Sequence, residues 1–330
     1  MIISRTPLRI TFVGGGTDLP EFYEQYGGAV LSATIDKWIH VVVAPRFERD
    51  VRVSYSRTEI VDNATAVEHE LVREAMRLTG VPRGVDIVTL ADVPSRGTGL
   101  GSSSAVTVGL LNALYAFQGI YKPPQELAEQ AAYIEIEVIG KPIGRQDQYA
   151  AAVGGVNFIE FLPAGAGVRV EPLVCPPGTF KQLQRSLLLF FTGRPRSSDA
   201  VLSGQRSAIE NGAAITSLKT MRDLAFELRE RLGSGDVDAL GRLLCANWEL
   251  KRGLAEGVTN EHVDGWYERA LAAGATGAKL LGAGGGGFFL AYASPDAHDA
   301  VRRALSDLRE VPLRLAARGT HIALFEHSEP

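Results

Sequence analysis

Short apolar runs alternate with helical patterns along the whole chain. Residues 51–55 switch between apolar and polar positions with a period of two, which predicts a half-buried strand. The continuous apolar run at 187–192 predicts a fully buried strand. We expect further strands over residues 39–44, 86–90, 288–293 and 319–325.

Apolar residues at helical spacing occur in both halves of the chain. Val67, Leu71, Ala75 and Leu78 lie on one helical face, and Gly80 follows them as a plausible C-cap. We expect the other helices over residues 105–117, 124–139, 199–231, 236–251 and 296–308. Because strands and helices are mixed in both halves, the sequence predicts the α+β class.

A change of composition divides the chain near its middle. Residues 162–177 hold four prolines and have three glycines nearby, which is typical of a linker or a string of turns. We therefore place a domain boundary just after this stretch. The predicted N-terminal domain covers residues 1–178, and the predicted C-terminal domain covers residues 179–330.

Composition narrows the class of protein. The formal net charge of −4 does not favour binding to nucleic acid or to an anionic membrane. No apolar run approaches the length of a membrane span, and the first residues lack an export signal, so we expect a cytoplasmic protein. We expect Cys175 and Cys245 to be buried free thiols, and the six histidines show no zinc-binding spacing.

Residues 94–105 carry the clearest chemical signal, and they read Pro-Ser-Arg-Gly-Thr-Gly-Leu-Gly-Ser-Ser-Ser-Ala. Glycines let a backbone approach a ligand closely, and the serines stand where a helix would begin, with unpaired amides and a positive dipole end. Such a loop favours phosphate binding. It lacks the Gly-Lys-Ser/Thr of a Walker A loop and the third glycine of a dinucleotide fingerprint. The alternative is a flexible loop without a ligand.

Two further segments combine glycines with charged residues. Arg9 stands inside an otherwise apolar strand, so it needs either a ligand or a structural carboxylate as its partner. Asp147 lies in a Gly-bounded loop after a helix that carries Glu135 and Glu137. These three carboxylates suit metal and proton chemistry; alternatively, Asp147 caps a helix and the glutamates face solvent.

The last candidate segment is a run of four glycines, 284–287, directly before a predicted strand. Consecutive glycines do not help a core to pack and carry a high cost in conformational entropy. A close approach of this backbone to a ligand or to another loop would explain them. A flexible hairpin is the alternative.

Together, and in this order along nearly the whole chain, these segments resemble the GHMP kinase superfamily. Gly-Gly-Gly-Thr-Asp at 14–18, Gly-Arg-Gln-Asp-Gln-Tyr at 144–149 and Trp-Glu-Leu-Lys-Arg at 248–252 are similar to the bacterial D-glycero-D-manno-heptose 7-phosphate 1-kinases. The resemblance implies a two-domain GHMP kinase fold, with a ribosomal protein S5 domain 2-like N-terminal domain and a ferredoxin-like C-terminal domain. It also implies transfer of the ATP γ-phosphoryl group to O1 of the heptose 7-phosphate, for GDP-heptose synthesis.

The resemblance assigns ATP and Mg²⁺ as cofactors. Ser103 and Glu137 would be the Mg²⁺ ligands, with Glu135 as a second candidate. Asp147 would accept or orient the proton of the anomeric hydroxyl, and Arg9 would counter charge beside it. The residues implied for ATP binding are Pro94, Gly97, Gly99, Leu100, Gly101, Ser102, Ser103 and Ser104.

The resemblance also implies contacts to the acceptor, and a phosphorylated sugar needs a cation site as well. Two segments offer that site: a turn just before a helix, which would bind a dianion well, and the basic end of another helix. An exposed basic loop is the alternative for the turn. The residues implied for the acceptor are Gly15, Gly16, Thr17, Asp18, Gly285 and Gly286, with Arg194, Arg196, Ser197, Lys251 and Arg252 as candidates for its phosphate.

Two other functions stay open at this point. One is another anomeric sugar or cyclitol kinase, such as a fucokinase-like enzyme, whose unphosphorylated acceptor has no need of Arg194 and Arg196. The other is a non-catalytic binding member of the family, and the joint presence of four residues argues against it: Arg9, Ser103, Glu137 and Asp147. We expect a small-molecule sugar phosphate as partner, and a homodimer stays open.

Overall fold

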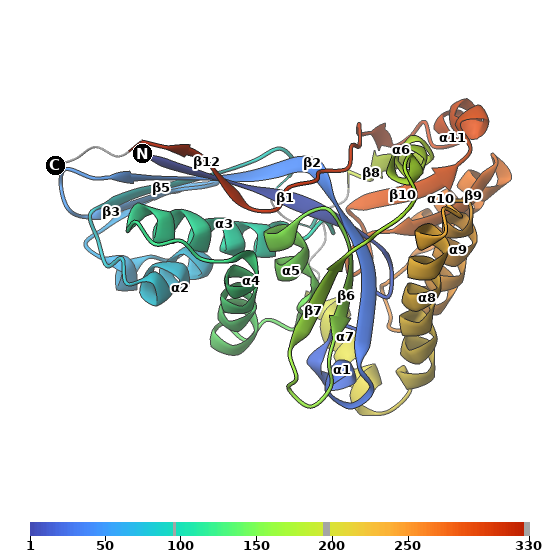
Figure 1. Cartoon of the computed structure of the whole chain (residues 1–330), viewed down its shortest axis with the longest axis horizontal. Helices are drawn as coiled ribbons and strands as arrows, with labels where there is room; N and C mark the ends of the chain where they lie inside the picture. Colours follow the sequence, from blue (N-terminus) through green and yellow to red (C-terminus); the bar gives the residue numbers. More distant parts are fainter. Residues whose placement is uncertain (95–96, 194–198, 327–330) are drawn as a thin grey trace.

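Two β-sheets form the framework of the computed structural model, which describes residues 1–94, 97–193 and 199–326. The first sheet has eight strands, with the order β12-β1-β2-β5-β3-β4 and with β6 and β7 joined to it through β2. The second sheet has four strands in the order β11-β8-β10-β9. Figure 1 shows helices α2 to α5 along one side of the first sheet, and α8 and α9 beside the second.

The described elements have the following bounds. The first sheet consists of β1 (Ile2–Val13), β2 (Gly28–Pro45), β3 (Val51–Ser54), β4 (Thr58–Val61), β5 (Val85–Ala91), β6 (Val156–Phe161), β7 (Val168–Pro172) and β12 (His321–Phe325). The second consists of β8 (Leu187–Phe191), β9 (Ala275–Leu280), β10 (Phe288–Ala293) and β11 (Arg309–Glu310). The α-helices are α1 (Pro20–Tyr26), α2 (Glu70–Thr79), α3 (Ser102–Phe117), α4 (Pro124–Ala132), α5 (Gln146–Val153), α6 (Thr179–Arg185), α7 (Asp199–Glu210), α8 (Ile215–Gly233), α9 (Ala239–Arg252), α10 (Glu261–Ala272) and α11 (His298–Ala304). A π-helical turn, Tyr133–Val138, continues α4, and 3₁₀ turns lie at Ala64–Ala66 and Pro295–Ala297.

Strand β2 organises the first sheet because it is long enough to pair with three partners. Its first part, from Gly28 to Ala33, pairs with β6, and its last part, from Ile39 to Pro45, pairs with β5. Strand β1 runs antiparallel beside it over most of its length. Such a long strand is rich in β-branched residues and is buried along most of its first half, so it reaches across the molecule rather than ending at a turn.

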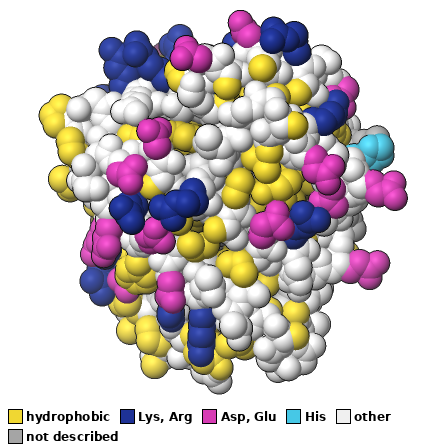
Figure 2. Space-filling model, turned by 90° about the vertical axis from the view of Figure 1, so that its right-hand side faces the viewer, with side chains coloured by type: hydrophobic (Ala, Val, Ile, Leu, Met, Phe, Trp, Pro, Cys, Tyr) yellow, Lys and Arg dark blue, Asp and Glu magenta, His cyan; other side chains and the backbone are white. Residues whose placement is uncertain are grey.

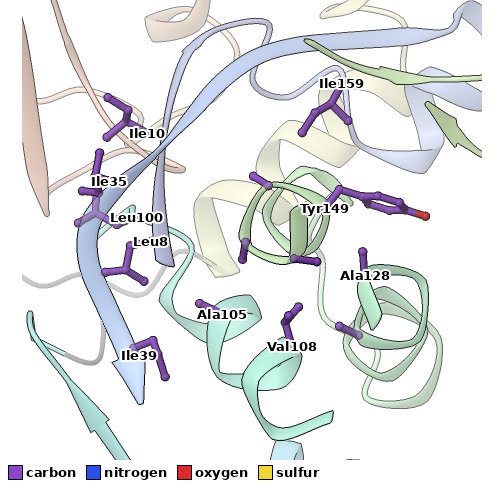
Figure 3. Packing of buried hydrophobic residues seen from close by; sticks show 14 of the residues in the cluster. Leu8, Ile10, Ile35, Ile39, Leu100, Ala105, Val108, Ala128, Tyr149 and Ile159 are labelled. Carbon is purple, nitrogen blue, oxygen red and sulfur yellow. The ribbon is translucent and has the colours of Figure 1, made fainter. Parts of the chain in front are cut away.

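The main core lies between the first sheet and α3. Leu8 and Ile10 of β1 are fully buried, as are Ala105 and Val108 of α3. Figure 3 shows these side chains gathered between the strands and the helices, together with Leu100 from the loop that precedes α3. Because α3 is apolar on nearly all sides, the sheet and α2, α4 and α5 can enclose it. The start of α3 is therefore held rigidly at one end of the sheet.

The two sheets are joined by helix α9, which contacts both of them, and by helix α8 beside it. Helix α8 packs against β2 of the first sheet, and α9 packs against β9 of the second and β1 of the first. The last strand, β12, returns to the first sheet and pairs with β1 from Ile2 to Arg5. Residues 321–325 thus belong to the sheet of the predicted N-terminal domain, although they follow the predicted boundary near residue 178.

Several sequence-based expectations need correction. The segment 162–177, expected to be a linker or a string of turns, contains strand β7, which occupies the edge of the first sheet beside β6. The segment 199–231 forms two helices, α7 and α8, and the end of the segment 124–139 is π-helical. Cys175 and Cys245 are free thiols, as expected, but both are partly exposed rather than buried.

The surface agrees with the modest net charge of −4. Lys and Arg side chains are interspersed with Asp and Glu over the face in Figure 2. Within the described ranges, no helix is both long and apolar enough to cross a membrane.

Candidate active site

A cavity of about 1150 Å³ opens between elements of the two sheets. Its walls come from β1, the Gly-Ser loop with the start of α3, the loop before α5, the end of α9 and the glycine-rich loop before β10. Each of the four segments that the sequence singled out contributes to this cavity. Residues far apart in the chain therefore meet in one place.

The two glycine-rich loops lie directly against each other. Gly99 has a φ of +72°, and a Cβ atom there would come within 2.5 Å of Leu281 O. Gly287 has a φ of +104°, and its Cβ would come within 2.5 Å of Thr98 O. The Phe288 N–H donates to Thr98 O at 3.1 Å. The glycines at 284–287 thus serve a close approach to another loop, one of the two explanations offered by the sequence.

Helix α3 begins at the cavity. Gly101, in the left-handed conformation with a φ of +75°, precedes Ser102 as the N-cap residue. The first amides of a helix lack intrahelical partners and carry a partial positive charge, so this end favours an anion. Ser102, Ser103 and Ser104 all line the cavity. Gly97, Gly99 and Gly101 line it as well, whereas Leu100 is completely buried in the core.

Arg9 and Asp147 form the best-defined polar contact of the cavity. Arg9 Nε donates to Asp147 Oδ1 at 2.7 Å, and its Nη2 atom lies 2.6 Å from the same oxygen. Arg9 Nη1 donates to Gly99 O at 2.7 Å. Arg9 is buried, with 5% of its surface exposed, whereas 23% of the Asp147 side chain remains exposed. The arginine inside the apolar strand therefore has a carboxylate partner and also holds the Gly-Ser loop.

Asp18 is a second carboxylate close to Asp147. Its Oδ1 atom accepts from the Gly16 N–H at 3.0 Å, and its Oδ2 atom accepts from the Gln146 N–H at 3.3 Å. Burial, and then the charge of Asp147, raise the pKa of Asp18. Gly144 is required beside it, because a Cβ there would lie 2.0 Å from Asp18 Oδ2. The cavity thus holds two adjacent acids in different environments.

Thr17 does not face the cavity as the resemblance implied. Its hydroxyl donates to Gly14 O at 2.8 Å and to Ala29 O at 3.0 Å, and it accepts from the Ala29 N–H at 3.1 Å. Its single hydroxyl hydrogen is shared between these two carbonyls, so the side chain closes the turn after β1. Gly15 and Gly16 do line the cavity.

The structure places Glu135, rather than Glu137, beside Ser103. The Ser103 hydroxyl donates to Glu135 Oε1 at 2.7 Å, and Gln148 Nε2 donates to Glu135 Oε2 at 2.8 Å. The side chain of Glu137 is 56% exposed, and its nearest cation is Arg145, at 4.0 Å. The resemblance implied Glu137, with Glu135 as a second candidate, but the π-helical turn changes which residues face inward. Burial raises the pKa of Glu135, against the opposing effect of Lys141.

Two buried lysines, Lys251 and Lys279, also line the cavity. Lys251 is 6% exposed, and its ammonium group donates to Gly282 O. Burial, and then the charge of Arg9, lower the pKa of Lys251 to about 8. Lys279 is 1% exposed and donates to Thr11 O at 3.0 Å and to Phe12 O at 2.9 Å. Burial, and then Lys251 and Arg9, lower its pKa as well.

Other implied substrate and ATP residues lie elsewhere. Arg252 turns away from the cavity, 3.5 Å from Asp264 and 3.6 Å from Glu249. Gly285 is bonded to Val258 and Asn260, so Gly286, but not Gly285, lines the cavity. Pro94 is not among the lining residues. Arg194, Arg196 and Ser197 lie outside the described residues.

Several residues that line the cavity were not predicted from the sequence. A lysine inside the apolar strand β9 was a visible signal for Lys279, of the same kind that drew attention to Arg9. The other positions carry no distinctive local pattern, because glutamine and threonine are common on exposed helices and strands. These residues are Thr11, Lys141, Gln146, Gln205 and Lys279.

Comparison with known proteins identifies the family of this chain. The family model of the GHMP kinases N terminal domain matches residues 66–155, and that of the GHMP kinases C terminal matches residues 225–309. A D-glycero-alpha-D-manno-heptose 7-phosphate kinase from Campylobacter jejuni is 30% identical, over 89% of this chain and 90% of its own length. The chain belongs to the GHMP kinases. Its two-domain α+β architecture is the fold of these kinases.

Other relatives of this GHMP kinase act on several sugars. A bifunctional fucokinase/GDP-fucose pyrophosphorylase from Arabidopsis thaliana is 29% identical over 94% of this chain, which covers 31% of that protein. Among solved structures, a D-glycero-D-manno-heptose 1-phosphate kinase from Bacteroides thetaiotaomicron is 26% identical, with a TM-score of 0.81, covering 99% of this chain and all of its own. This GHMP kinase is therefore a phosphotransferase related to sugar kinases.

The residues near Ser103 fit a magnesium ion that arrives with phosphates. Within the described part of the chain, no group of three or more His, Cys, Asp and Glu side chains could hold a metal. Mg²⁺ commonly takes only one or two carboxylates and completes its shell with phosphate oxygens and water. Glu135 is a fully buried carboxylate that accepts a hydrogen bond from the Ser103 hydroxyl. Ser103 Oγ and Glu135 Oε1 therefore lie together, and both are oxygen atoms of the kind that Mg²⁺ prefers.

Proposed function

We propose that this GHMP kinase transfers the γ-phosphoryl group of ATP to O1 of D-glycero-D-manno-heptose 7-phosphate. The product is the 1,7-bisphosphate, a precursor for GDP-heptose synthesis. The observation that carries the proposal is the Arg9–Asp147 pair, set in one cavity with the Gly-Ser loop and the buried Lys251. The heptose is favoured because the relatives from Campylobacter jejuni and Bacteroides thetaiotaomicron are both named for phosphorylated heptose. ATP is a cytoplasmic cofactor, so the proposal includes a cytoplasmic location.

The nucleotide half of the cavity is built from the Gly-Ser loop and the start of α3. Amides of residues 97–103 would bind the ATP phosphates, with the partial positive charge of the helix end adding to the attraction. The apolar side chains of Ile39, Leu71, Leu90 and Val93 line the same cavity and suit a nucleobase. Ser103 and Glu135 would hold Mg²⁺, which neutralises charge on the phosphates when bound.

The acceptor half of the cavity is centred on Asp147. Phosphoryl transfer depends mostly on positioning and charge neutralisation, because its loose transition state needs little activation of the nucleophile. Asp147 would receive or orient the proton of the anomeric hydroxyl. Arg9 holds Asp147 in place and presents its own charge beside the transferring group. Asp18, whose two oxygens face the turn 14–18 and the loop 144–146, would bind sugar hydroxyls.

Lys251 is the described cation best placed for the acceptor phosphate. A buried lysine with one carbonyl partner has unused donors, and an anion that enters the cavity would satisfy them. Arg252 is directed toward Asp264 and Glu249, so we assign this role to Lys251 alone of the pair. Arg194, Arg196 and Ser197 stay candidates for the same phosphate.

A screen of acceptors tests the proposal. The purified chain is incubated with ATP and Mg²⁺, and ADP release is measured with heptose 7-phosphate, mannose 6-phosphate, fucose and cyclitols. We expect the highest kcat/KM with heptose 7-phosphate and a new phosphate on C1, observed by phosphorus NMR. Turnover of unphosphorylated sugars alone would remove the heptose assignment and favour the fucokinase-like alternative. A lack of ADP release with every acceptor would favour a binding protein.

A further inference from the structure

Lys141 places its ammonium group on the same two side chains that the proposed function assigns to the metal. Its Nζ atom donates to Ser103 Oγ at 3.2 Å and lies 3.8 Å from Glu135 Oε1. Its backbone N–H donates to Glu135 O at 2.9 Å. Main chain and side chain of Lys141 thus both contact Glu135 of the π-helical turn. The cation is part of the site and not a free surface charge.

The ammonium group of Lys141 supplies the counter-charge for the buried carboxylate of Glu135. Glu135 is fully buried, and its hydrogen bonds from Ser103 and Gln148 are contacts to neutral groups. A buried carboxylate without a nearby cation is costly. Within the described part of the chain, Lys141 is the cation that forms an ion pair with Glu135. Its ammonium group can therefore take the place of a metal ion as the counter-charge.

The ammonium group and a divalent cation would compete for the same oxygens. Both would need Ser103 Oγ and Glu135 Oε1, and two positive charges this close repel each other in a partly buried site. Lys141 has room to move, because its side chain is 21% exposed and has a flexible four-carbon stem. It also has a second carboxylate partner, since Glu70 Oε1 lies 3.4 Å from its Nζ atom.

We propose that Lys141 is an internal counter-ion that competes with the divalent cation for Ser103 and Glu135. The inference rests on the metal role that the proposed function gives these two residues. Without nucleotide, the ammonium group occupies their oxygens, so a metal ion alone binds poorly. A triphosphate brings anionic oxygens to the N-terminus of α3, and the ammonium group can pair with these oxygens instead of with Glu135. Metal and nucleotide therefore bind with positive coupling, which is reciprocal by thermodynamic necessity.

Titration with Mn²⁺ as a spin-active probe tests this without any turnover. Free Mn²⁺ is followed by electron paramagnetic resonance in the presence of the full chain and the absence of nucleotide. We expect weak binding to the wild type and roughly tenfold or more tighter binding to Lys141→Gln, a size typical of coupling between sites. Lys141→Arg keeps the charge and should bind as weakly as the wild type. The double variant Lys141→Gln, Glu135→Gln should lose the gain.

A second titration includes a non-hydrolysable ATP analogue. The factor by which the analogue tightens Mn²⁺ binding should be larger in the wild type than in Lys141→Gln. Equal Mn²⁺ affinities of the wild type and Lys141→Gln without nucleotide would overturn the proposal. A gain that persists in the double variant would also overturn it, because the ion would then sit elsewhere. Thermal unfolding of each variant confirms that it is folded.

The same measurements separate this inference from the proposed function. No sugar is present, so a failed heptose assignment leaves the expected Mn²⁺ results unchanged. If Glu135→Gln binds Mn²⁺ with the ATP analogue as tightly as the wild type, the metal role of Glu135 has failed, and the inference fails with it.

Discussion

Arg9 binds Asp147 through two of its nitrogens, which share one carboxylate oxygen at 2.7 and 2.6 Å. The third nitrogen of the guanidinium group donates to Gly99 O at 2.7 Å. The Arg9 side chain thus fixes the distance between Asp147 and the Gly-Ser loop, which is proposed to hold ATP. Arginine can do this because its planar group presents several donors in a rigid arrangement. The geometry of the two halves of the site is therefore set before any ligand binds.

Replacement of Asp147 by asparagine should abolish most of the activity. Asparagine keeps the size of the side chain but cannot accept the proton of the anomeric hydroxyl. We expect kcat to fall by about a hundredfold to ten-thousandfold, the usual range for loss of a positioned acid or base. Affinity for an ATP analogue should change little. Steady-state kinetics and calorimetry measure the two quantities.

Asp307→Asn is a matched control for that variant. Asp307 also pairs with an arginine, Arg269 at 2.9 Å, but it is not among the residues that line the cavity. Its replacement should leave kcat unchanged. A fully active Asp147→Asn enzyme would contradict the assignment of Asp147 as the group that accepts the proton. It would leave Asp147 with a role that involves no proton transfer.

A pair of glutamate variants distinguishes the two candidates for the metal. Glu135→Gln should raise the Mg²⁺ concentration needed for half-maximal activity by at least about tenfold, since even indirect partners of a metal cost about 10–100-fold in affinity. Glu137→Gln should behave like the wild type, because its side chain is 56% exposed and near Arg145. Kinetics over a range of Mg²⁺ concentrations give the answer. The opposite pattern would restore Glu137 as the ligand.

The charge of Lys251 should govern the affinity for the acceptor at alkaline pH. Its pKa is lowered to about 8, so the ammonium form is present below this pH and is lost above it. We expect kcat/KM for the sugar phosphate, which reports ionisations of the free enzyme, to decrease as pH rises through about 8. Lys251→Met should have a higher KM at neutral pH and lose this dependence.

Arg252→Gln is the control on the same helix. Arg252 faces Asp264 and Glu249, so its replacement should leave both KM and the pH profile as they are in the wild type. A Lys251→Met enzyme with an unchanged KM would transfer the phosphate role to the segment that contains Arg194 and Arg196.

Lys251→Met should also make the fold more stable at neutral pH. The folded-state pKa of Lys251 lies below its ordinary value of 10.5, so the unfolded chain binds more protons between about 8 and 10.5. Below this window the buried charge destabilises the fold, and the wild type recovers that stability as pH rises through it. A shift from 10.5 to about 8 corresponds to about 3 kcal/mol, at about 1.4 kcal/mol per unit. Urea unfolding at pH 7 and pH 10 should show the advantage of the variant shrinking at the higher pH.

Gly99→Ala should damage the contact between the two glycine-rich loops. The added Cβ would lie 2.5 Å from Leu281 O, and the φ of +72° is unfavourable for alanine. Gly119→Ala is a matched control, because Gly119 has a φ of +73° with nothing within 4 Å of a Cβ. The control should cost about 1–2 kcal/mol from backbone conformation alone. Gly99→Ala should cost about 1–3 kcal/mol more, and it should weaken binding of an ATP analogue. Equal unfolding free energies would show that the loops adjust.

Much of the fold could be predicted from local patterns. Helix α3 was expected over residues 105–117 and occupies 102–117, and β8 and β10 lie where apolar runs indicated strands. These segments have a strong period or a continuous apolar run, which are the most reliable signals. Strand β7 was missed because the four prolines of the segment 162–177, one of them Pro172 at the end of β7, are typical of a linker. Proline is tolerated there because β7 is an edge strand, where a missing N–H leaves no partner unsatisfied.

The amino-acid sequence by itself determined which chemical groups the site could contain. A glycine- and serine-rich loop before a helix, an arginine in an apolar strand and a carboxylate in a Gly-bounded loop are local features, set by backbone freedom and the cost of burial. Only the tertiary structure decided which side chains lie together: Glu135 rather than Glu137 is beside Ser103, Lys251 rather than Arg252 lines the cavity, and Lys141 contacts Ser103. These choices depend on a π-helical turn and on packing between two sheets, and side chains one or two positions apart in a helix point in different directions.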